Sequence, residues 1–451
     1  MAISSTLQQR RKKLAQLLDT PIILWSGGLL SRNFPANCFP FRASSHFLYF
    51  TALNLPHTAI HLAQGELTLF YDNPPPNSAL WHGEMPTREV IAENMGAEQA
   101  YPWAELTNFV SPQTATIPVQ DYRTSQQQSQ ILQRSLPASD RLRGNDLKLA
   151  QAIVQLRLQH DKESLKEIRE AIQVSILAHQ AGIKASIKAQ TEAEVRSAIE
   201  QVIIKANMTN AYPSIVTSHG EILHNESYSN LIKVGDLILA DVGAETRGGW
   251  AADITRTFPV GGKFSPSQQA IYQIVLAAHD RCIAAMQPGV EYQDIHLLAA
   301  RTIAEGLVDL GILKGNSADL VEMDAHALFF PHGIGHLLGL DVHDMEDLGD
   351  IAGYATGRSR SNRFGLGYLR LNRPLMSGMV VTIEPGFYQV PAILNNPELR
   401  YKFKNVVNWQ RLADFADVRG IRIEDDVLIT STGVEVLSAA LPTKIPDIEQ
   451  R

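Results

Sequence analysis

Hydrophobic and polar residues follow different periods along the first third of the chain. Charged residues and leucines recur at helical spacing over residues 8–18, which predicts an amphipathic helix. Short apolar runs bounded by turn-forming residues predict strands at residues 21–27, 46–53, 58–63 and 66–71. The stretch 126–145 is polar and predicts an irregular segment. We therefore expect residues 1–150 to form a mixed α/β domain.

A different periodicity opens the second part of the chain. A long helical pattern begins near residue 147 and, with a break near His160, continues to about residue 188. We place the domain boundary within residues 146–160, so that the second domain covers residues 151–451. Helical stretches such as 265–286, which starts with Ser-Pro, then alternate with glycine-bounded apolar runs. This mixture predicts the α+β class.

One spacing occurs twice in the second domain. Gly235 lies six residues before Asp241, and Gly378 lies six residues before Glu384, with strand-like residues between them in both cases. The match indicates two related halves, each of which ends a strand with a carboxylate. Residues 349–373 hold glycines, serines and five arginines, which predicts a long surface loop of the kind that covers a site.

Acidic residues interrupt four apolar runs of the second domain, at Asp241, Asp253, Glu384 and Glu424. A glycine-containing turn joins the runs around the two aspartates, which is the pattern of a hairpin. An ionised carboxylate is costly to bury without a cation, and the nearest cation in the sequence, Arg256, can pair with only one aspartate. For each acid alone, a salt bridge or turn amides explain the pattern as well as a metal ion does. The four acids together favour divalent cations.

Histidines gather in one glycine-rich apolar stretch, where His332, His336 and His343 stand within twelve residues. A lone histidine is more often a core or surface residue, but three favour a site. His336 is the best candidate for a metal ligand, whereas His332 and His343 are candidates to hold substrate or to move protons. A fourth candidate is His224, seventeen residues before Asp241. Four carboxylates with one imidazole favour manganese, cobalt or zinc, and shared carboxylates can hold two ions about 3.5–4 Å apart.

Composition narrows the classes of partner. The chain is 45% hydrophobic and carries a net charge of −7, which gives no support for binding to nucleic acid or to an anionic membrane. We expect small-molecule partners instead. The two cysteines, Cys38 and Cys282, do not make a disulfide framework, which favours a reducing compartment. The N-terminus lacks a signal-peptide pattern, and no apolar run approaches the roughly 18 residues of a membrane span, so we expect a cytoplasmic protein.

The motifs of the second domain resemble those of a known family. They are LHNES, LADVGAE, ADITRTFPV, HGIGHLLGLDVHD, TIEPG and GIRIEDD, in this order along the chain. The family is that of the metal-dependent pita-bread peptidases, which includes Xaa-Pro dipeptidases (prolidases) and Xaa-Pro aminopeptidases (aminopeptidase P). The stretch RNFPANCFPFRASSHFLYFTAL resembles the family's N-terminal domain less tightly. The resemblance covers the whole chain and implies a pita-bread (creatinase/aminopeptidase-like) catalytic domain that hydrolyses Xaa-Pro bonds.

The resemblance also implies two divalent metal ions, most often Mn²⁺, with Co²⁺ and Zn²⁺ as alternatives. The implied ligands are Asp241, Asp253, His336, Glu384 and Glu424. Asp253 and Glu424 would bridge the ions, Asp241 would complete one site, and His336 with Glu384 the other. Glu384 would also accept a proton from the bridging water. The two aspartates stand twelve residues apart where the family usually shows eleven, and we place the extra residue in the turn at 245–251.

Further roles follow from the same resemblance. His224 and His343 would contact the substrate and stabilise the developing oxyanion, and His332 is a further catalytic candidate. Arg422, two residues before Glu424, would orient the carboxylates. Tyr212 would line a pocket for the proline ring.

The choice between dipeptidase and aminopeptidase depends on the segments between the ligands. The spacings from His336 to Glu384 and from Glu384 to Glu424 are similar to those of prolidases. GLGYLRLNR resembles the prolidase stretch whose arginine binds the free carboxylate of a dipeptide, which corresponds to Arg370. A solvated loop arginine is the alternative interpretation of Arg370. We expect a dipeptidase, with Xaa-Pro aminopeptidase as the alternative.

Other functions are compatible with the same fold. A non-catalytic pita-bread binding protein and a metal-free creatine-type amidinohydrolase are disfavoured by the complete ligand set, whereas hydrolysis of organophosphorus esters stays open as a side activity. Relatives also imply a homodimer in which the N-terminal domain of one subunit, through Trp81, approaches the active site of its neighbour.

Overall fold

The computed structural model describes residues 2–450, which divide into two compact units. The first unit holds the described residues up to Leu158 together with Arg247–Gly249 and Met345–Ala352. The second holds Gln159–Thr246, Trp250–Asp344 and the described residues from Gly353 onward. Within the described part of the chain, no helix combines the length and the apolar character needed to cross a bilayer.

A four-stranded sheet forms the centre of the first unit, with strand order β1-β4-β5-β6. Its strands are β1 (Ile22–Trp25), β4 (Ala59–Ala63), β5 (Glu66–Phe70) and β6 (Gln99–Tyr101). The first three run antiparallel, and β6 pairs with β5 in parallel. The strands predicted at 21–27, 58–63 and 66–71 are therefore confirmed, and so is the N-terminal helix, α1 (Ala2–Leu17). This sheet is mixed, as expected.

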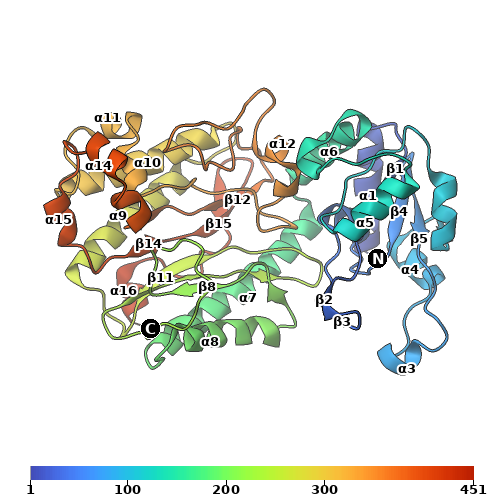
Figure 1. Cartoon of the computed structure of the whole chain (residues 1–451), viewed down its shortest axis with the longest axis horizontal. Helices are drawn as coiled ribbons and strands as arrows, with labels where there is room; N and C mark the ends of the chain where they lie inside the picture. The colour runs from blue at the N-terminus through green and yellow to red at the C-terminus, as the bar shows by residue number, and fades with distance from the viewer. Residues whose placement is uncertain (1, 451) are drawn as a thin grey trace. The chain divides into compact units, whose positions relative to one another are not determined.

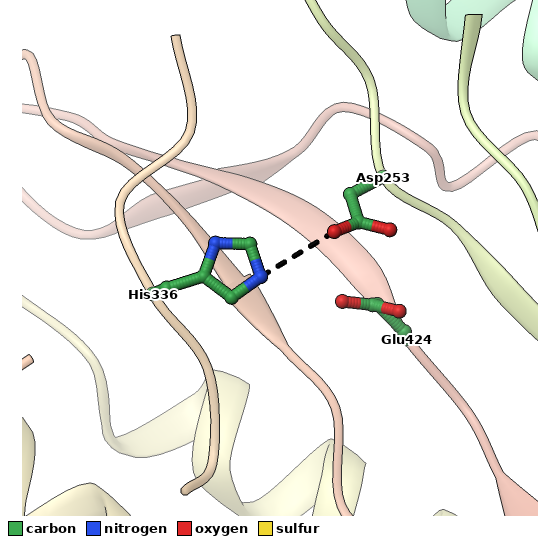
Figure 2. Close-up of side chains that lie close together, drawn as sticks. All are labelled: Asp253, His336 and Glu424. Atoms are coloured by element: carbon green, nitrogen blue, oxygen red, sulfur yellow. Dashed lines mark ion pairs between the residues drawn. The ribbon is translucent and has the colours of Figure 1, made fainter. Parts of the chain in front are cut away.

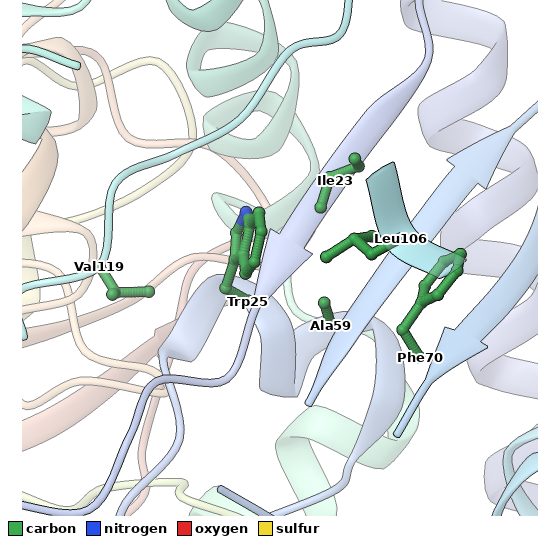
Figure 3. Close-up of a cluster of buried hydrophobic side chains, with 6 residues drawn as sticks. All are labelled: Ile23, Trp25, Ala59, Phe70, Leu106 and Val119. Carbon is green, nitrogen blue, oxygen red and sulfur yellow. The ribbon is translucent and has the colours of Figure 1, made fainter. Parts of the chain in front are cut away.

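Apolar side chains from this sheet and the segments that follow it form a core. The cluster consists of Ile23, Trp25, Ala59, Phe70, Leu106 and Val119, drawn in Figure 3. The indole N–H of Trp25 donates to Thr116 Oγ1 at 3.1 Å, so the one polar atom of this side chain is satisfied. Other elements of this unit are β2 (Ser31–Phe34), β3 (Asn37–Cys38), α3 (Ala79–His82), α4 (Arg88–Met95), η1 (Trp103–Phe109), η2 (Ser139–Arg141), α6 (Gly144–Arg157) and η4 (Glu346–Leu348).

Two predictions for the first unit are wrong. Residues 46–53 were expected to form a strand but lie mostly in a helix, α2 (Ser45–Thr51), in which every residue is buried. An apolar run that is buried on all sides has no period that separates a helix from a strand. The stretch 126–145, expected to be irregular, begins inside α5 (Tyr122–Ile131). This helix lies largely on the surface, and its start is fixed by Asp121, whose carboxylate accepts from the backbone N–H groups of Arg123 and Thr124.

Two helix pairs and the strands between them make up the second unit (Figure 1). The helix α7 (Lys162–Ser186) packs along α8 (Glu192–Lys205), and α9 (Pro266–Ala285) packs along α10 (Tyr292–Asp309). The helices predicted near 147–188 and 265–286 are thus confirmed. Ser265 and Gln268 form a capping box that fixes the start of α9. Shorter elements are α11 (Ser317–Glu322), η3 (Ala325–Leu328), α13 (Pro391–Leu394), α14 (Pro397–Lys402), α15 (Trp409–Ala413) and α16 (Ile445–Glu449), whereas α12 (Asp350–Gly353) lies mostly in the first unit.

The strands of the second unit form small antiparallel sheets. One has the order β11-β9-β8, with β8 (Ile215–Thr217), β9 (Leu237–Asp241) and β11 (Thr255–Pro259). Another has the order β12-β15-β16, with β12 (Val380–Ile383), β15 (Asp425–Ile429) and β16 (Val434–Val436). Two-stranded sheets pair β13 (Gly386–Tyr388) with β14 (Gly420–Arg422), and β10 (Ala244–Glu245) with β7 (Thr209–Asn210). A single bridge between Thr255 and Glu424 links β11 to the start of β15.

The repeated spacing corresponds to a repeated local structure. Gly235 and Gly378 both adopt positive φ, at 97° and 93°, in turns that precede β9 and β12. The first of these strands ends at Asp241, and the second is followed directly by Glu384. The predicted hairpin is only partly confirmed. β9 and β11 do pair, with Asp241 opposite Thr255, but the connection between them contains β10 and is longer than a tight turn.

Candidate metal centre and active site

A cavity of about 400 Å³ in the second unit gathers most of the residues that the sequence singled out. Its lining includes His224, Asp241, Asp253, His332, His336, His343, Arg370, Glu384, Arg422 and Glu424. The carboxylates lie where strands begin or end. Asp241 is the last residue of β9, Glu384 follows β12, and Glu424 precedes β15. A residue at the end of a strand can direct its side chain into the cavity, while the sheet holds the backbone beside it in place.

Asp253, His336 and Glu424 form the tightest group, with one ligand atom of each within 4.8 Å of the others. Figure 2 shows the three side chains directed toward one another from separate segments. His336 Nε2 lies 3.3 Å from Asp253 Oδ2, while Nδ1 lies 3.0 Å from the backbone oxygen of Leu337. A carbonyl oxygen can only accept, so Nδ1 carries the proton of the neutral ring, and the lone pair of Nε2 faces the carboxylates. This is the orientation of a metal-binding histidine.

The other two predicted ligands lie around this group. Glu384 Oε1 is 3.7 Å from His336 Nε2. Asp241 is linked to Asp253 by the hydroxyl oxygen of Tyr212, which lies 2.6 Å and 2.5 Å from one carboxylate oxygen of each. Asp241 and Asp253 therefore face one cavity, although the segment between them is one residue longer than is usual in the family that the sequence motifs resemble.

The hydroxyl of Tyr212 lies between the two aspartates. Tyr212 is not among the residues that line the cavity. Its predicted role beside the proline ring stays a prediction. A phenol in such surroundings needs an acceptor for its proton, and the carboxylates provide it.

The guanidinium of Arg422 donates hydrogen bonds to three residues of the site that lie far from it in the sequence. Its Nη2 donates to Asp241 Oδ2 at 2.6 Å, and its Nε donates to Thr255 Oγ1 at 3.1 Å. Thr255 Oγ1 in turn donates to Glu424 Oε2 at 2.6 Å. The remaining Nη1 donates to the hydroxyl of Tyr388 at 2.9 Å. One guanidinium thus orients Asp241 directly and Glu424 through a hydroxyl.

Arg256 pairs with neither Asp241 nor Asp253, although the sequence made it a candidate partner for one of them. Its Nη2 pairs with Asp425 at 2.7 Å, and its Nη1 donates to the backbone oxygen of Glu424 at 2.6 Å. Successive side chains of a strand point to opposite faces, so Arg256 and Asp425 lie behind the sheet while Thr255 and Glu424 face the site. Arg256 therefore holds the backbone from which Glu424 projects.

The electrostatics of the carboxylates call for a cation. Burial raises the pKa of Asp253 to about 8, and the nearby Asp241 adds to this shift. Burial likewise raises the pKa of Glu384 to about 7, although His336 opposes the shift. The pKa of Glu424 lies well above its usual range, through burial and then through Asp253. Bound divalent cations would offset this cost, and hard oxygen donors with one imidazole suit Mn²⁺, Co²⁺ or Zn²⁺.

The remaining histidines line the same cavity. The ring centre of His343 lies 4.2 Å from that of His336, and the two rings are in a T-shaped arrangement. His332 Nδ1 donates to the backbone oxygen of Gly333 at 2.8 Å, and its Nε2 lies 2.9 Å from the hydroxyl of Tyr388. Burial, aided by Arg422, lowers the pKa of His332 to about 3, so this ring is neutral and its orientation is fixed. Burial and Arg422 also lower the pKa of His224.

Arg370 lies in the cavity wall, as expected, together with apolar residues. The apolar lining consists of Leu223, Pro331, Val390 and Ile393. Sequence reasoning missed Arg360, which also lines the cavity, and the hydroxyl groups of Thr255 and Tyr388. The only available signal for Thr255 was its position two residues after Asp253, on the same face of a strand.

Comparison with known proteins agrees with this geometry. Residues 166–431 match the model of metallopeptidase family M24, and residues 7–117 match that of the aminopeptidase P N-terminal domain. A probable Xaa-Pro aminopeptidase of Fusarium vanettenii is 33% identical over 420 residues, covering 90% of this chain and 86% of that protein. The human Xaa-Pro dipeptidase is 29% identical over 453 residues, covering 98% of this chain and 90% of that protein.

Solved structures show the same likeness. The aminopeptidase PepP of Pseudomonas aeruginosa superimposes with a TM-score of 0.80 at 28% identity, covering 99% of this chain and 97% of that one. A variant of Escherichia coli aminopeptidase P in complex with substrate gives a TM-score of 0.79 at 26% identity, with the same coverage. The expected pita-bread architecture is confirmed, and the chain is a metallopeptidase that belongs to family M24.

Proposed function

We propose that this chain hydrolyses the Xaa-Pro bond of short peptides, preferentially dipeptides, with the aid of two divalent metal ions, which we propose to be manganese. The observation that carries the proposal is a single cavity that combines four carboxylates and the imidazole of His336 with Arg370. The names of the relatives support Xaa-Pro peptides as the substrate class.

The ligands of the proposed ions are the five residues around this cavity. Asp253 and Glu424, which lie in the tightest group, would be shared between the ions. Asp241 would complete one site, and His336 with Glu384 the other, in keeping with the 3.7 Å between Nε2 and Oε1. Two divalent ions in such a site supply Lewis acidity and an activated water.

Side chains of the protein carry out proton transfer, substrate binding and stabilisation of the oxyanion. Glu384 accepts a proton from the attacking water, because its carboxylate lies at the edge of the ligand group. His224 and His343, on the cavity wall, contact the substrate and stabilise the oxyanion that develops at the scissile carbonyl. His332 is held neutral between Gly333 and Tyr388 and positions the substrate.

Arg370 supports the preference for dipeptides. A dipeptide ends in a carboxylate directly after proline, and a guanidinium in the wall of the same cavity can bind it with two parallel hydrogen bonds. A longer substrate lacks this carboxylate at that position. Xaa-Pro aminopeptidase activity is the second candidate, favoured by the names of the Fusarium vanettenii relative and of the Pseudomonas aeruginosa structure.

We also propose a homodimer. Trp81 and Leu80 on α3 of the first unit are 77% and 79% exposed, and apolar side chains so exposed are typical of interfaces. Size-exclusion chromatography tests this proposal, since a fully active monomer would contradict it.

The decisive experiment measures hydrolysis of an Xaa-Pro dipeptide and of an Xaa-Pro-Yaa tripeptide by the purified, manganese-loaded chain, with a chelated sample as control. Faster cleavage of the dipeptide supports the proposal. Faster cleavage of the tripeptide would assign the chain to the aminopeptidase branch, and inactivity on both peptides would overturn the proposed substrate class.

A further inference from the structure

The segment 354–370 is held firmly on both sides of Arg360. Arg358 pairs with Glu291 through two contacts, of 2.5 Å and 2.9 Å. Arg363 pairs with Asp324 at 3.0 Å and donates to the backbone oxygen of Glu322 at 2.8 Å. Arg360 therefore lies in a short segment whose two ends are fixed. The bidentate ion pair of Arg358 fixes one end, and the two hydrogen bonds donated by Arg363 fix the other.

Buried packing fixes the rest of the segment. The backbone oxygen of Gly365 accepts from His296 Nε2 at 2.8 Å. A Cβ atom at Gly365 would lie 2.7 Å from the ring of His326, so the segment can approach this ring only with glycine here. The loop that carries Arg360 is therefore a preorganised wall of the cavity.

The guanidinium of Arg360 lies against the backbone that leads into Arg370. Its Nη1 donates to the backbone oxygen of Leu369 at 3.4 Å, and its Cζ lies 5.6 Å from the ring centre of Tyr354. The hydroxyl of Tyr354 donates to the same oxygen of Leu369 at 2.7 Å. Arg360 and Arg370 both line the cavity, but Arg360 is exposed and Arg370 is half-buried. The wall thus carries two cations, one at the rim and one deeper.

We propose that Arg360 is a second specificity residue, which binds the terminal carboxylate of an Xaa-Pro-Yaa tripeptide. The inference rests on the proposed function, in which Arg370 binds the carboxylate of a dipeptide. One added residue moves the carboxylate outward by about 3.5 Å, from the half-buried guanidinium toward the exposed one. The two arginines together would make the chain select short peptides with a free carboxyl end, and would reject amides of the same length.

The test compares the wild-type chain with Arg360→Gln and Arg370→Gln on three substrates: alanyl-proline, alanyl-prolyl-glycine and the amide of this tripeptide. Arg301→Gln serves as the matched control, because Arg301 is an exposed arginine of α10 outside the cavity lining. All proteins carry manganese, and their thermal unfolding is compared to confirm equal folding.

We expect Arg360→Gln to lower kcat/KM for the tripeptide acid about fivefold to tenfold more than for its amide or for the dipeptide. Arg370→Gln should instead impair the dipeptide most. Equal effects of Arg360→Gln on all three substrates, or no effect, would overturn the inference; the proposed dipeptidase would stand if Arg370→Gln still impaired the dipeptide selectively. A wild-type chain inactive on all three substrates would overturn the proposed function, and this inference with it.

Discussion

Buried acids dominate the chemistry of this chain at the scale of single residues. The residues Asp253 and Glu424 are 5% and 2% exposed, and burial shifts the pKa of both upward. Such carboxylates must either keep a proton or share a cation. Arg422 pairs with Asp241 rather than with the group around His336, so we propose that metal ions supply positive charge to this group.

Removing one shared carboxylate should therefore abolish the site. Asp253→Asn replaces the anion that we propose to bridge two ions with a neutral amide, so we expect metal content to fall below the proposed two ions per chain and kcat/KM to fall more than about 100-fold. Elemental analysis and dipeptide hydrolysis measure the two effects. Asp309→Asn, which changes an exposed carboxylate of α10, is the matched control. Two ions retained per chain in Asp253→Asn would contradict the bridging role.

Arg422 acts through other residues rather than on the substrate. Arg422→Lys keeps the charge but cannot reach Asp241, Thr255 and Tyr388 together, so we expect metal affinity to fall about 10–100-fold. Calorimetric titration of the metal-free variant with Mn²⁺ measures this loss. Since the charge is retained, an unchanged affinity would show that the fork of hydrogen bonds does not position the ligands.

At the scale of elements, the site depends on where strands begin and end. β9 and β12 each start after a glycine turn and deliver a carboxylate at their far end. β12 and β15 pair with Ile383 opposite Asp425, so Glu384 and Glu424 leave adjacent strands at the same edge. A shift of one residue in the pairing of β12 with β15 would turn a ligand to the opposite face of the sheet.

The glycine turns should accordingly be sensitive to substitution. At Gly235, φ is 97° and a Cβ atom would meet no atom within 4 Å, so the cost of Gly235→Ala is backbone strain alone. We expect the free energy of unfolding to fall by about 1–2 kcal/mol. Gly433→Ala is the control, because its Cβ atom also meets open space but its φ lies outside the positive region, and it should change stability by less than about 0.5 kcal/mol. Equal values for the two variants in denaturant unfolding would contradict the strain argument.

At the scale of the whole molecule, buried histidines contribute to how stability responds to acid. Burial lowers the pKa of His296 to about 4 and that of His326 to about 3. Neither ring nitrogen of His326 has a hydrogen-bond partner within residues 2–450. Both rings are therefore neutral in the folded chain near pH 7, whereas in the unfolded chain they bind protons below about pH 6.5.

The contribution of these two histidines to the free energy of unfolding should consequently decrease as the pH falls from 6.5 toward 4. The unfolded chain takes up protons in this range and the folded chain does not, which costs on the order of 2 kcal/mol per histidine at pH 5. Urea unfolding at pH 7.5 and pH 5 measures the loss. His326→Leu should reduce it, and His82→Gln, at an exposed histidine of α3, should not. The same loss in His326→Leu as in the wild-type chain would contradict the assignment.

The sequence by itself determined the local features of this protein. Helices and strands with a clear period, such as α7, α9 and β4, were predicted within a few residues. The candidate ligands could also be found, because an acid inside an apolar run violates the hydrophobic pattern wherever the run lies in the fold. Glycine spacing likewise revealed the two halves, since a positive φ restricts the residue type locally.

Only the tertiary structure decided which of these residues meet. Thr255 and Glu424 stand 169 positions apart, and Arg422 reaches Asp241 across 181, so no local pattern could indicate their hydrogen bonds. The helix α2 was predicted wrongly and the partner of Arg256 was not predicted for the same reason, because burial on all sides and the choice of sheet face are set by distant segments. The place of Arg360 in the cavity wall also follows from contacts with Leu369 and Tyr354 that form only in the folded chain.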